Sequence, residues 1–211
     1  YTTLFRSDLL VDPLCVAALN TPATEASAAV FLRVLKDGLF GGRGACDLLL
    51  PRCPLHELLP GPALRWLTDH GAQVHEGQRV MQLQQRAEGW QLDGQTFDAV
   101  VLACSAQEAA RLVDPVNADW SALARGLRFE PIVTAYVSCE GARLPSPMIA
   151  LQEDTRSPAQ FVFDQGVISG QPGRFAFVVS GAAPWVERGL DATAQAVLGQ
   201  AQRCLPAAQW P

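Results

Sequence analysis

The chain has 211 residues, of which 49% are hydrophobic and 18% are charged, and its formal net charge is −5. This composition predicts a globular protein of one ordinary domain or two small ones and excludes a disordered or collagen-like chain. The acidic balance lacks the basic surface that nucleic acids bind, so we expect no nucleic-acid partner.

Several catalytic chemistries are excluded by missing residues. Lys36 is the single lysine, and Asp37 follows it, whereas a P-loop needs serine or threonine after its lysine. A Schiff-base lysine would also have to be Lys36. The sequence contains no H-E-x-x-H, C-x-x-C or G-x-S-x-G motif. With only His56, His70 and His75 as imidazole ligands, no metal site is expected.

The cysteines are scattered and predict reduced, mostly buried thiols of a cytoplasmic protein. They are Cys15, Cys46, Cys53, Cys104, Cys139 and Cys204. A redox pair of Cys46 with Cys53 is the alternative. Apolar runs stay well below the ~18 residues of a membrane span.

Residues 1–7 (YTTLFRS) resemble a translated sequencing adapter, with a natural tail as the alternative, and are set aside from fold reasoning. We interpret the whole chain as a fragment of a longer reading frame. Motifs that decide function are therefore expected outside it.

A first helix is predicted over residues 21–40, with Thr21 as N-cap and Pro22 in the first turn. Its polar residues form one stripe: Arg33, Lys36 and Asp37. Because the remaining surface is mostly apolar, we expect this helix to be largely buried or to line an apolar pocket.

Residues 61–104 alternate between helix and strand signals. A helix over 61–71 precedes four predicted strands, at 73–75, 80–84, 89–92 and 97–103. Asp93-Gly94 predicts a hairpin turn, and the nearly continuous apolar run 97–103 is typical of a strand covered on both faces. This order predicts an α/β nucleotide-binding domain with a small β insertion.

The remainder predicts short helices and a mainly antiparallel sheet. The helices are expected at 107–112, capped by Ser105, and at 120–127. The strands are expected at 132–139, 148–151, 160–164 and 175–180, before a final helix over 183–204.

The predicted fold class is α/β: a nucleotide-binding domain with a β-meander beside an α+β domain with a mainly antiparallel sheet. Residues 8–60 form a helical part of the α+β domain and 61–112 the nucleotide-binding part. Residues 113–211 supply the antiparallel sheet and the long helix.

Four further runs carry a family resemblance. They are 13–22 (PLCVAALNTP), 47–52 (DLLLPR), 130–134 (EPIVT) and 180–186 (SGAAPWV). Together with the 61–104 block, they closely resemble the hydroxysqualene dehydroxylases, the squalene-associated, FAD-dependent branch of the flavin amine oxidase and carotenoid desaturase superfamily. The resemblance covers residues 8–211. It implies that residues 61–112 are part of a Rossmann-like FAD-binding domain, that 8–60 and 113–211 belong to the substrate domain, and that the fold is truncated at both ends.

The resemblance implies where FAD would bind. The family's G-x-G-x-x-G fingerprint and its C-terminal Gly-Asp motif are both missing from this sequence. Val80 matches the valine whose main chain contacts adenine, and Ala103 and Cys104 end the strand that lies beside the cofactor. Since the phosphate-binding turn is missing, the 211-residue chain alone is expected to be inactive and to hold FAD weakly.

The implied reaction removes an allylic hydroxyl from hydroxysqualene to give squalene, with reduced flavin as hydride source. Candidate pocket residues are Tyr136, Phe161, Phe163 and Trp185; no catalytic residue is assigned. An isoprenoid lipid substrate implies peripheral contact with a membrane, partly through the helix at 22–40. The oligomeric state is left open.

Two alternatives remain at this point. The same scaffold also serves carotenoid desaturases and amine oxidases, which run oxidations. A non-catalytic module that binds an apolar ligand is the other reading, and retention of FAD would separate it from the enzymes.

Overall fold

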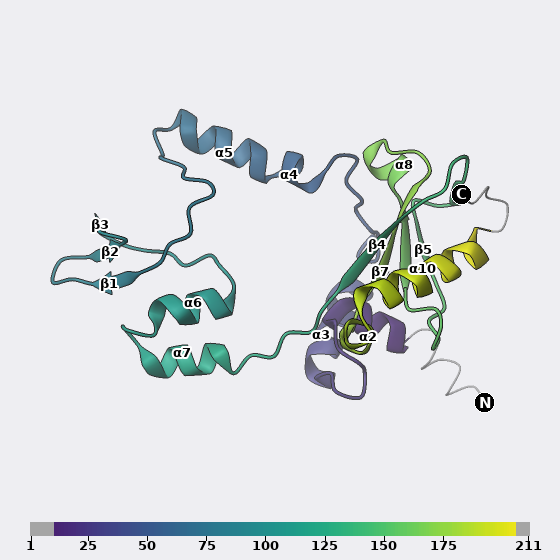
Figure 1. Cartoon of the computed structure of the whole chain (residues 1–211), viewed down its shortest axis with the longest axis horizontal. Coiled ribbons are helices and arrows are strands. Elements are labelled where there is room, and N and C mark those ends of the chain that lie inside the picture. Colours follow the sequence, from purple (N-terminus) through teal and green to yellow (C-terminus); the bar gives the residue numbers. More distant parts are fainter. Residues whose placement is uncertain (1–10, 206–211) are drawn as a thin grey trace. The chain divides into compact units, whose positions relative to one another are not determined.

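A computed structural model describes residues 11–205 of the chain (Figure 1). The chain divides into two compact units, a larger one made of residues up to 63 together with those from 130 onward, and a smaller one made of Leu64–Phe129. The adapter-like residues 1–7 lie outside the described part. The sequence-based domain boundaries at 60/61 and 112/113 thus differ from the divisions at 63/64 and 129/130.

The larger unit is built on a four-stranded antiparallel sheet with the order β4-β7-β6-β5. Its strands are β4 (Val133–Ser138), β5 (Met148–Ala150), β6 (Phe161–Asp164) and β7 (Arg174–Val179). All four lie where the sequence predicts them. Burial alternates along β4 and β6, because one face of the sheet packs on a core and the opposite face is more exposed.

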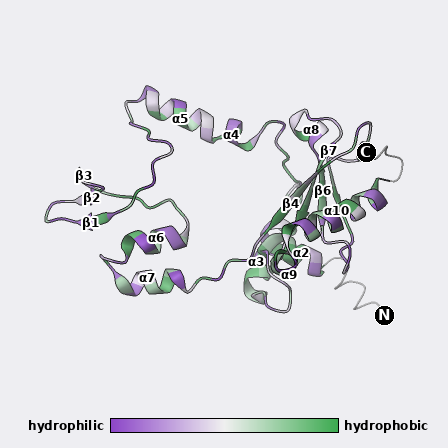
Figure 2. Ribbon diagram, in the orientation of Figure 1, coloured by the Kyte–Doolittle hydropathy of each residue, from purple (hydrophilic) through white to green (hydrophobic). Residues whose placement is uncertain are grey.

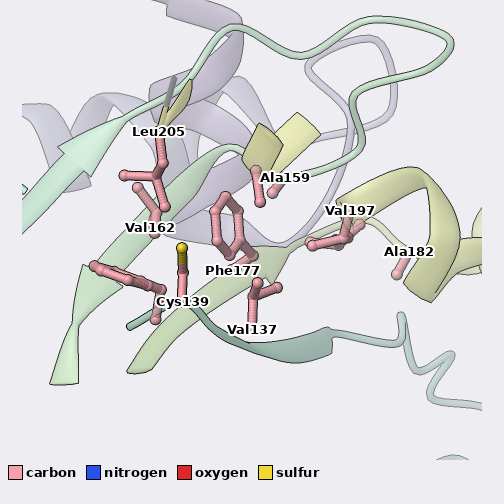
Figure 3. Packing of buried hydrophobic residues seen from close by; sticks show 11 residues of the cluster. Val137, Cys139, Ala159, Val162, Phe177, Ala182, Val197 and Leu205 are labelled. Atoms are coloured by element: carbon pink, nitrogen blue, oxygen red, sulfur yellow. The ribbon is translucent and has the colours of Figure 1, made fainter. Parts of the chain in front are cut away.

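The core of the larger unit lies between one face of this sheet and helix α10 (Leu190–Cys204) (Figure 3). Phe177 lies at the centre of the cluster and is fully buried, as are Val162 of β6 and Val197 of α10. Figure 2 shows mainly hydrophobic residues along β4, β6 and β7, the strands that supply side chains to this core. Burial of these aromatic and branched side chains supplies the main driving force for the fold of this unit.

The last predicted helix, 183–204, is wrong in one respect, because it is two helices. Helix α9 (Ala183–Glu187) ends before Gly189, and α10 begins after it. Gly189 has φ +98°, a left-handed conformation that interrupts a helix and favours glycine.

The first predicted helix begins six residues later than expected. Helix α3 (Ala28–Gly38) has Ser27 as N-cap, and a separate helix α2 (Asp12–Leu19) precedes it. Thr21 instead precedes a separate turn, in which the Ala26 N–H donates to the Pro22 carbonyl, and its hydroxyl donates to the Leu19 carbonyl at 3.0 Å. Within α3, all of whose residues are described, none is buried, so the expectation of a largely buried helix is wrong.

The smaller unit holds most of helix α5 (Pro60–Asp69), a three-stranded antiparallel meander and two helices that pack on each other. The meander is β1 (Leu83–Gln85), β2 (Trp90–Leu92) and β3 (Gln95–Phe97); the helices are α6 (Ala106–Val113) and α7 (Ala118–Arg125). The predicted Asp93-Gly94 turn and Ser105 cap are both confirmed, with φ +46° and +93° at the turn and the Ser105 hydroxyl accepting from the Glu108 N–H.

Two predicted strands of this unit are wrong. Residues 73–75 form no strand, and the apolar run 97–103 forms only the end of β3, with Val101 90% exposed. A strand needs a neighbour to satisfy its main-chain groups, and no described segment pairs with residues 98–103. Among the described strands, every pairing is antiparallel, so the observed class is mixed helix and antiparallel sheet.

A short helix, α4 (Leu55–Leu58), lies shortly before α5, and α8 (Gln165–Ser169) follows β6 directly. Across residues 11–205, no helix combines the length and apolar character needed to cross a membrane.

Candidate functional site

The predicted adenine contact, Val80, lies just before β1 in the smaller unit, in a stretch without regular structure. Side chains hold this stretch instead of strand partners. Arg111 of α6 donates to the carbonyls of Val80 and Met81, at 2.7 and 2.8 Å. The Asp93 carboxylate accepts from the N–H groups of Met81 and Gln82, at 3.0 and 2.8 Å. The backbone at 80–82 is therefore fixed from both sides.

An acidic side chain orients Arg111. Glu108, one turn earlier on α6, binds the guanidinium of Arg111 at 3.0 Å and that of Arg79 at 2.6 Å. These two arginines hold the pKa of the Glu108 carboxyl below its ordinary value, with the Arg111 hydrogen bond as the largest cause. A carboxylate that stays ionised keeps both cations in place at neutral pH.

The Val80 main chain meets part of what adenine binding requires. Its N–H has no acceptor among the described residues, so it is available to a ring nitrogen. Its carbonyl already accepts from Arg111, which leaves one lone pair for an amino group. The Val80 main chain therefore keeps one donor and one lone pair for a ligand, and its contact with adenine stays a prediction.

Ala103 and Cys104 lie in the exposed segment that leads into α6. The thiol of Cys104 is free, and Ser105 beside it caps the helix. Because the strand expected before them is not formed, the structure does not bring these two residues together with Val80. Their contact with the cofactor stays a prediction.

The second candidate site is a partly open cavity of about 1120 Å³ in the larger unit. Two of the four predicted pocket residues, Phe161 and Trp185, line it, together with Val16 of α2. The guanidinium of Arg188 lies 4.4 Å from the Trp185 ring centre, so the ring stays oriented. The cavity thus combines aromatic walls from a strand and a helix.

Polar groups occupy one side of this cavity. Gln160 is 2% exposed and donates to the Glu153 carboxylate at 2.7 Å. Its carboxamide also donates to the Ser180 carbonyl and accepts from the Ser180 N–H. The pKa of the neighbouring Asp154 carboxyl is lowered, chiefly by the Arg156 N–H that it accepts. An apolar ligand that carries one hydroxyl would find both kinds of partner here.

The other two pocket candidates lie on the sheet face opposite the core. Tyr136 pairs with Ala176, and Ala176 pairs with Phe163, so all three point to the same face. Phe161 lies two residues before Phe163 and shares that face. Tyr136 is 58% exposed, with the Arg174 guanidinium 4.6 Å from its ring centre. The structure therefore joins Phe161 to Trp185 in the cavity and leaves Tyr136 and Phe163 outside it.

Sequence reasoning missed the side chains that hold these two sites. The main ones are Arg111, which binds the Val80 carbonyl, and Asn20 at the end of α2, which accepts from the Gly181 N–H near the cavity. Arg111 lies 31 residues from Val80, and no local pattern predicts that bond. The run of residues 13–22, which carries part of the resemblance, contains Asn20, and this was the only sequence signal for it.

The six cysteines form no disulfide, so Cys46 and Cys53 are not joined. Only Cys15 and Cys139 are buried, so the expectation of mostly buried thiols is wrong. Among the described residues, no group of three His, Cys, Asp or Glu side chains is placed to hold a metal.

A family model for flavin-containing amine oxidoreductases matches residues 7–211. The chain therefore belongs to this family, which confirms a flavin as the expected cofactor. Two curated relatives are both named hydroxysqualene dehydroxylase. The protein of Sinorhizobium fredii is 31% identical over 144 residues, which cover 63% of this chain and 34% of the relative. The protein of Rhodopseudomonas palustris is 35% identical over 115 residues, covering 50% and 28%.

These matches confirm the resemblance on which the sequence analysis relied. The aligned regions span about a third of the length of the curated relatives.

Proposed function

We propose that this chain is part of an FAD-dependent oxidoreductase that reductively removes the hydroxyl group of hydroxysqualene to give squalene. The observation that carries the proposal is that both curated relatives bear that enzyme's name within a flavin-containing family. The cavity supports it, because Phe161 and Trp185 offer aromatic walls to an isoprenoid chain.

The flavin, when bound in its reduced form, would supply the hydride that replaces the hydroxyl, which would leave as water. The chain's own residues have other tasks. Val80 would hold the adenine through its main chain, on a backbone fixed by Arg111 and Asp93. Phe161 and Trp185 would bind the apolar body of the substrate and keep water from it. Glu153 would accept a hydrogen bond from the substrate hydroxyl.

In this proposal, residues 61–112 belong to a Rossmann-like FAD domain and 113–211 to the substrate domain. The G-x-G-x-x-G fingerprint does not occur in the sequence. The 211-residue chain by itself should therefore retain little FAD, because one main-chain strip cannot replace a pyrophosphate-binding turn. Purification of this chain with stoichiometric yellow flavin would contradict that part of the proposal.

A peripheral membrane contact is also part of the proposal, because a C30 hydrocarbon has to be taken from a bilayer. Helix α3 supports it with apolar side chains on its surface: Val30 is 51% and Leu32 is 64% exposed. The same helix also exposes the charged pair of Arg33 and Asp37, 2.5 Å apart, so it offers both apolar and charged side chains to the interface between water and lipid.

The test uses the complete enzyme that contains this chain, with hydroxysqualene presented in liposomes. Trp185→Ala should lower kcat/KM about tenfold or more, because the variant loses a large apolar contact with the substrate. Trp120→Ala, on the exposed surface of α7, is the matched control and should leave turnover unchanged. Equal activity of the two variants would contradict the placement of the substrate in this cavity. Turnover of small amines without turnover of the C30 alcohol would contradict the dehydroxylase proposal itself.

A further inference from the structure

Three stretches that lie far apart in the sequence meet at the side chain of Asn20. Its Nδ2 donates to the main-chain carbonyl of Glu130 at 2.7 Å, and its Oδ1 accepts from the Gly181 N–H at 2.8 Å. One carboxamide thus links the end of α2, the entry to β4 and the turn after β7. All three belong to runs that carry the family resemblance.

Glu130 extends this link to helix α9. Its carboxylate accepts from the N–H of Ala183, the first residue of α9, at 3.0 Å. The next main-chain pair, from the Ala182 N–H to the Pro131 carbonyl, is 2.9 Å long. Helix α9 otherwise has no side-chain cap of its own, so Glu130 fixes where it begins.

The link stands directly behind two walls of the cavity. Asn20 is the C-cap of α2, the helix that contributes Val16 to the lining. Glu130 holds the start of α9, the helix that contributes Trp185. The walls also approach each other closely, since a Cβ added to Gly181 would lie 3.8 Å from the Val16 side chain.

We propose that Asn20 and Glu130 are positioning residues that set the spacing between the α2 wall and the Trp185 wall of the cavity, and thereby its fit to an apolar substrate. This inference rests on the proposed function of the cavity. Neither residue belongs to the buried cluster between the sheet and α10, against which Trp185 packs. Breaking the link should therefore shift the start of α9 while the strand pairs of the sheet stay formed.

The local geometry offers variants that separate hydrogen bonding from conformation. Asn20 has φ +48° and ψ +35°, a left-handed conformation that glycine also adopts without strain. Asn20→Gly therefore removes both hydrogen bonds and keeps the backbone. Glu130→Gln retains an oxygen that accepts from Ala183, whereas Glu130→Ala removes it. Asn117→Gly, at the N-cap of α7 in the smaller unit, is the matched control.

The experiment measures KM and kcat for hydroxysqualene in liposomes, the Kd for squalene, the flavin absorbance and the melting temperature of the complete enzyme. We expect Asn20→Gly and Glu130→Ala to raise KM and the Kd for squalene about five- to tenfold, the effect of a lost hydrogen bond or two. Their kcat should stay within about twofold of wild type, with flavin absorbance unchanged. Glu130→Gln and Asn117→Gly should match the wild type.

Three results would overturn the inference. The first is an unchanged KM and Kd in Asn20→Gly and Glu130→Ala. The second is a joint fall of kcat, flavin content and melting temperature, which would show a role in folding only. The third is a Glu130→Gln variant as impaired as Glu130→Ala, because the carboxylate charge would then matter and not the bond to Ala183. If the wild type neither binds squalene nor turns over the alcohol, the proposed function has failed and this inference fails with it.

Discussion

The two compact units of this chain differ in how their strands find partners. In the larger unit, six residues of β4 pair with six of β7, and the large buried side chains Phe175 and Phe177 lie on the packed face. In the smaller unit, each described strand has three residues. The most buried residues of this unit include two small ones, Ala109 and Ala110 of α6. Strong apolar patterning yields a strand only where a partner segment is present.

The buried face of the larger sheet should carry most of its stability. Phe177→Ala should lower the free energy of unfolding by about 3–5 kcal/mol, because it removes a fully buried ring and leaves a cavity. Tyr136→Ala, on the open face of the same sheet, should cost about 1 kcal/mol or less, chiefly the lost contact with Arg174. Urea unfolding of the 211-residue chain measures both. Similar losses in the two variants would show that both faces are packed.

In the smaller unit, one side chain should matter more than any apolar contact of the meander. Asp93→Ala places alanine at φ +46° and removes the acceptor of two N–H groups, so it should cost about 2 kcal/mol of local stability. Asp93→Asn keeps both the left-handed preference and an acceptor oxygen and should lose much less. Amide exchange over residues 81–97 reports the difference. Equal exchange in the two variants would assign the turn to Gly94 alone.

The smallest expected effect concerns pH. The Glu108 pKa lies below its ordinary value of 4.5 in the folded chain, so its bonds to Arg79 and Arg111 contribute fully above pH 4.5. This contribution is lost as the pH falls from 4.5 through the lowered pKa. After correction for the intrinsic pH dependence of exchange, the amides of residues 80–82 should therefore lose protection as the pH falls. Glu108→Gln should flatten that response, and an unchanged response in this variant would exclude Glu108 as its source.

The elements that the sequence predicted well are those whose signal is local. The four strands of the larger sheet are short apolar runs separated by turn residues, the Asp93-Gly94 turn needs only two residues, and the Ser105 cap needs one. The start of α3 was misplaced because both Thr21 and Ser27 are residues that favour an N-cap, and the structure uses Ser27. The break at Gly189 was overlooked inside an otherwise apolar helix pattern.

The candidate sites were predictable only in part, for the same reason. Phe161 and Trp185 were found as aromatic residues near strand and helix ends, and the structure places both in the cavity. The residues that hold the sites in shape act across long stretches of chain, as Arg111 does on Val80 and Asn20 on Gly181. Bonds from a side chain to a distant main chain leave no periodicity in the sequence.

The link at Asn20 also sets an order of events during synthesis. Asn20 and Gly181 are separated by 161 residues, which a ribosome adding about 5–20 residues per second needs roughly 8–30 s to make. All of residues 64–129 are made within that interval. Small helical and hairpin elements form in microseconds, so the helices and the meander of residues 64–129 have time to form before Gly181 is added. The hydrogen bond between Gly181 and Asn20 can therefore form only after all of residues 64–129 have been made.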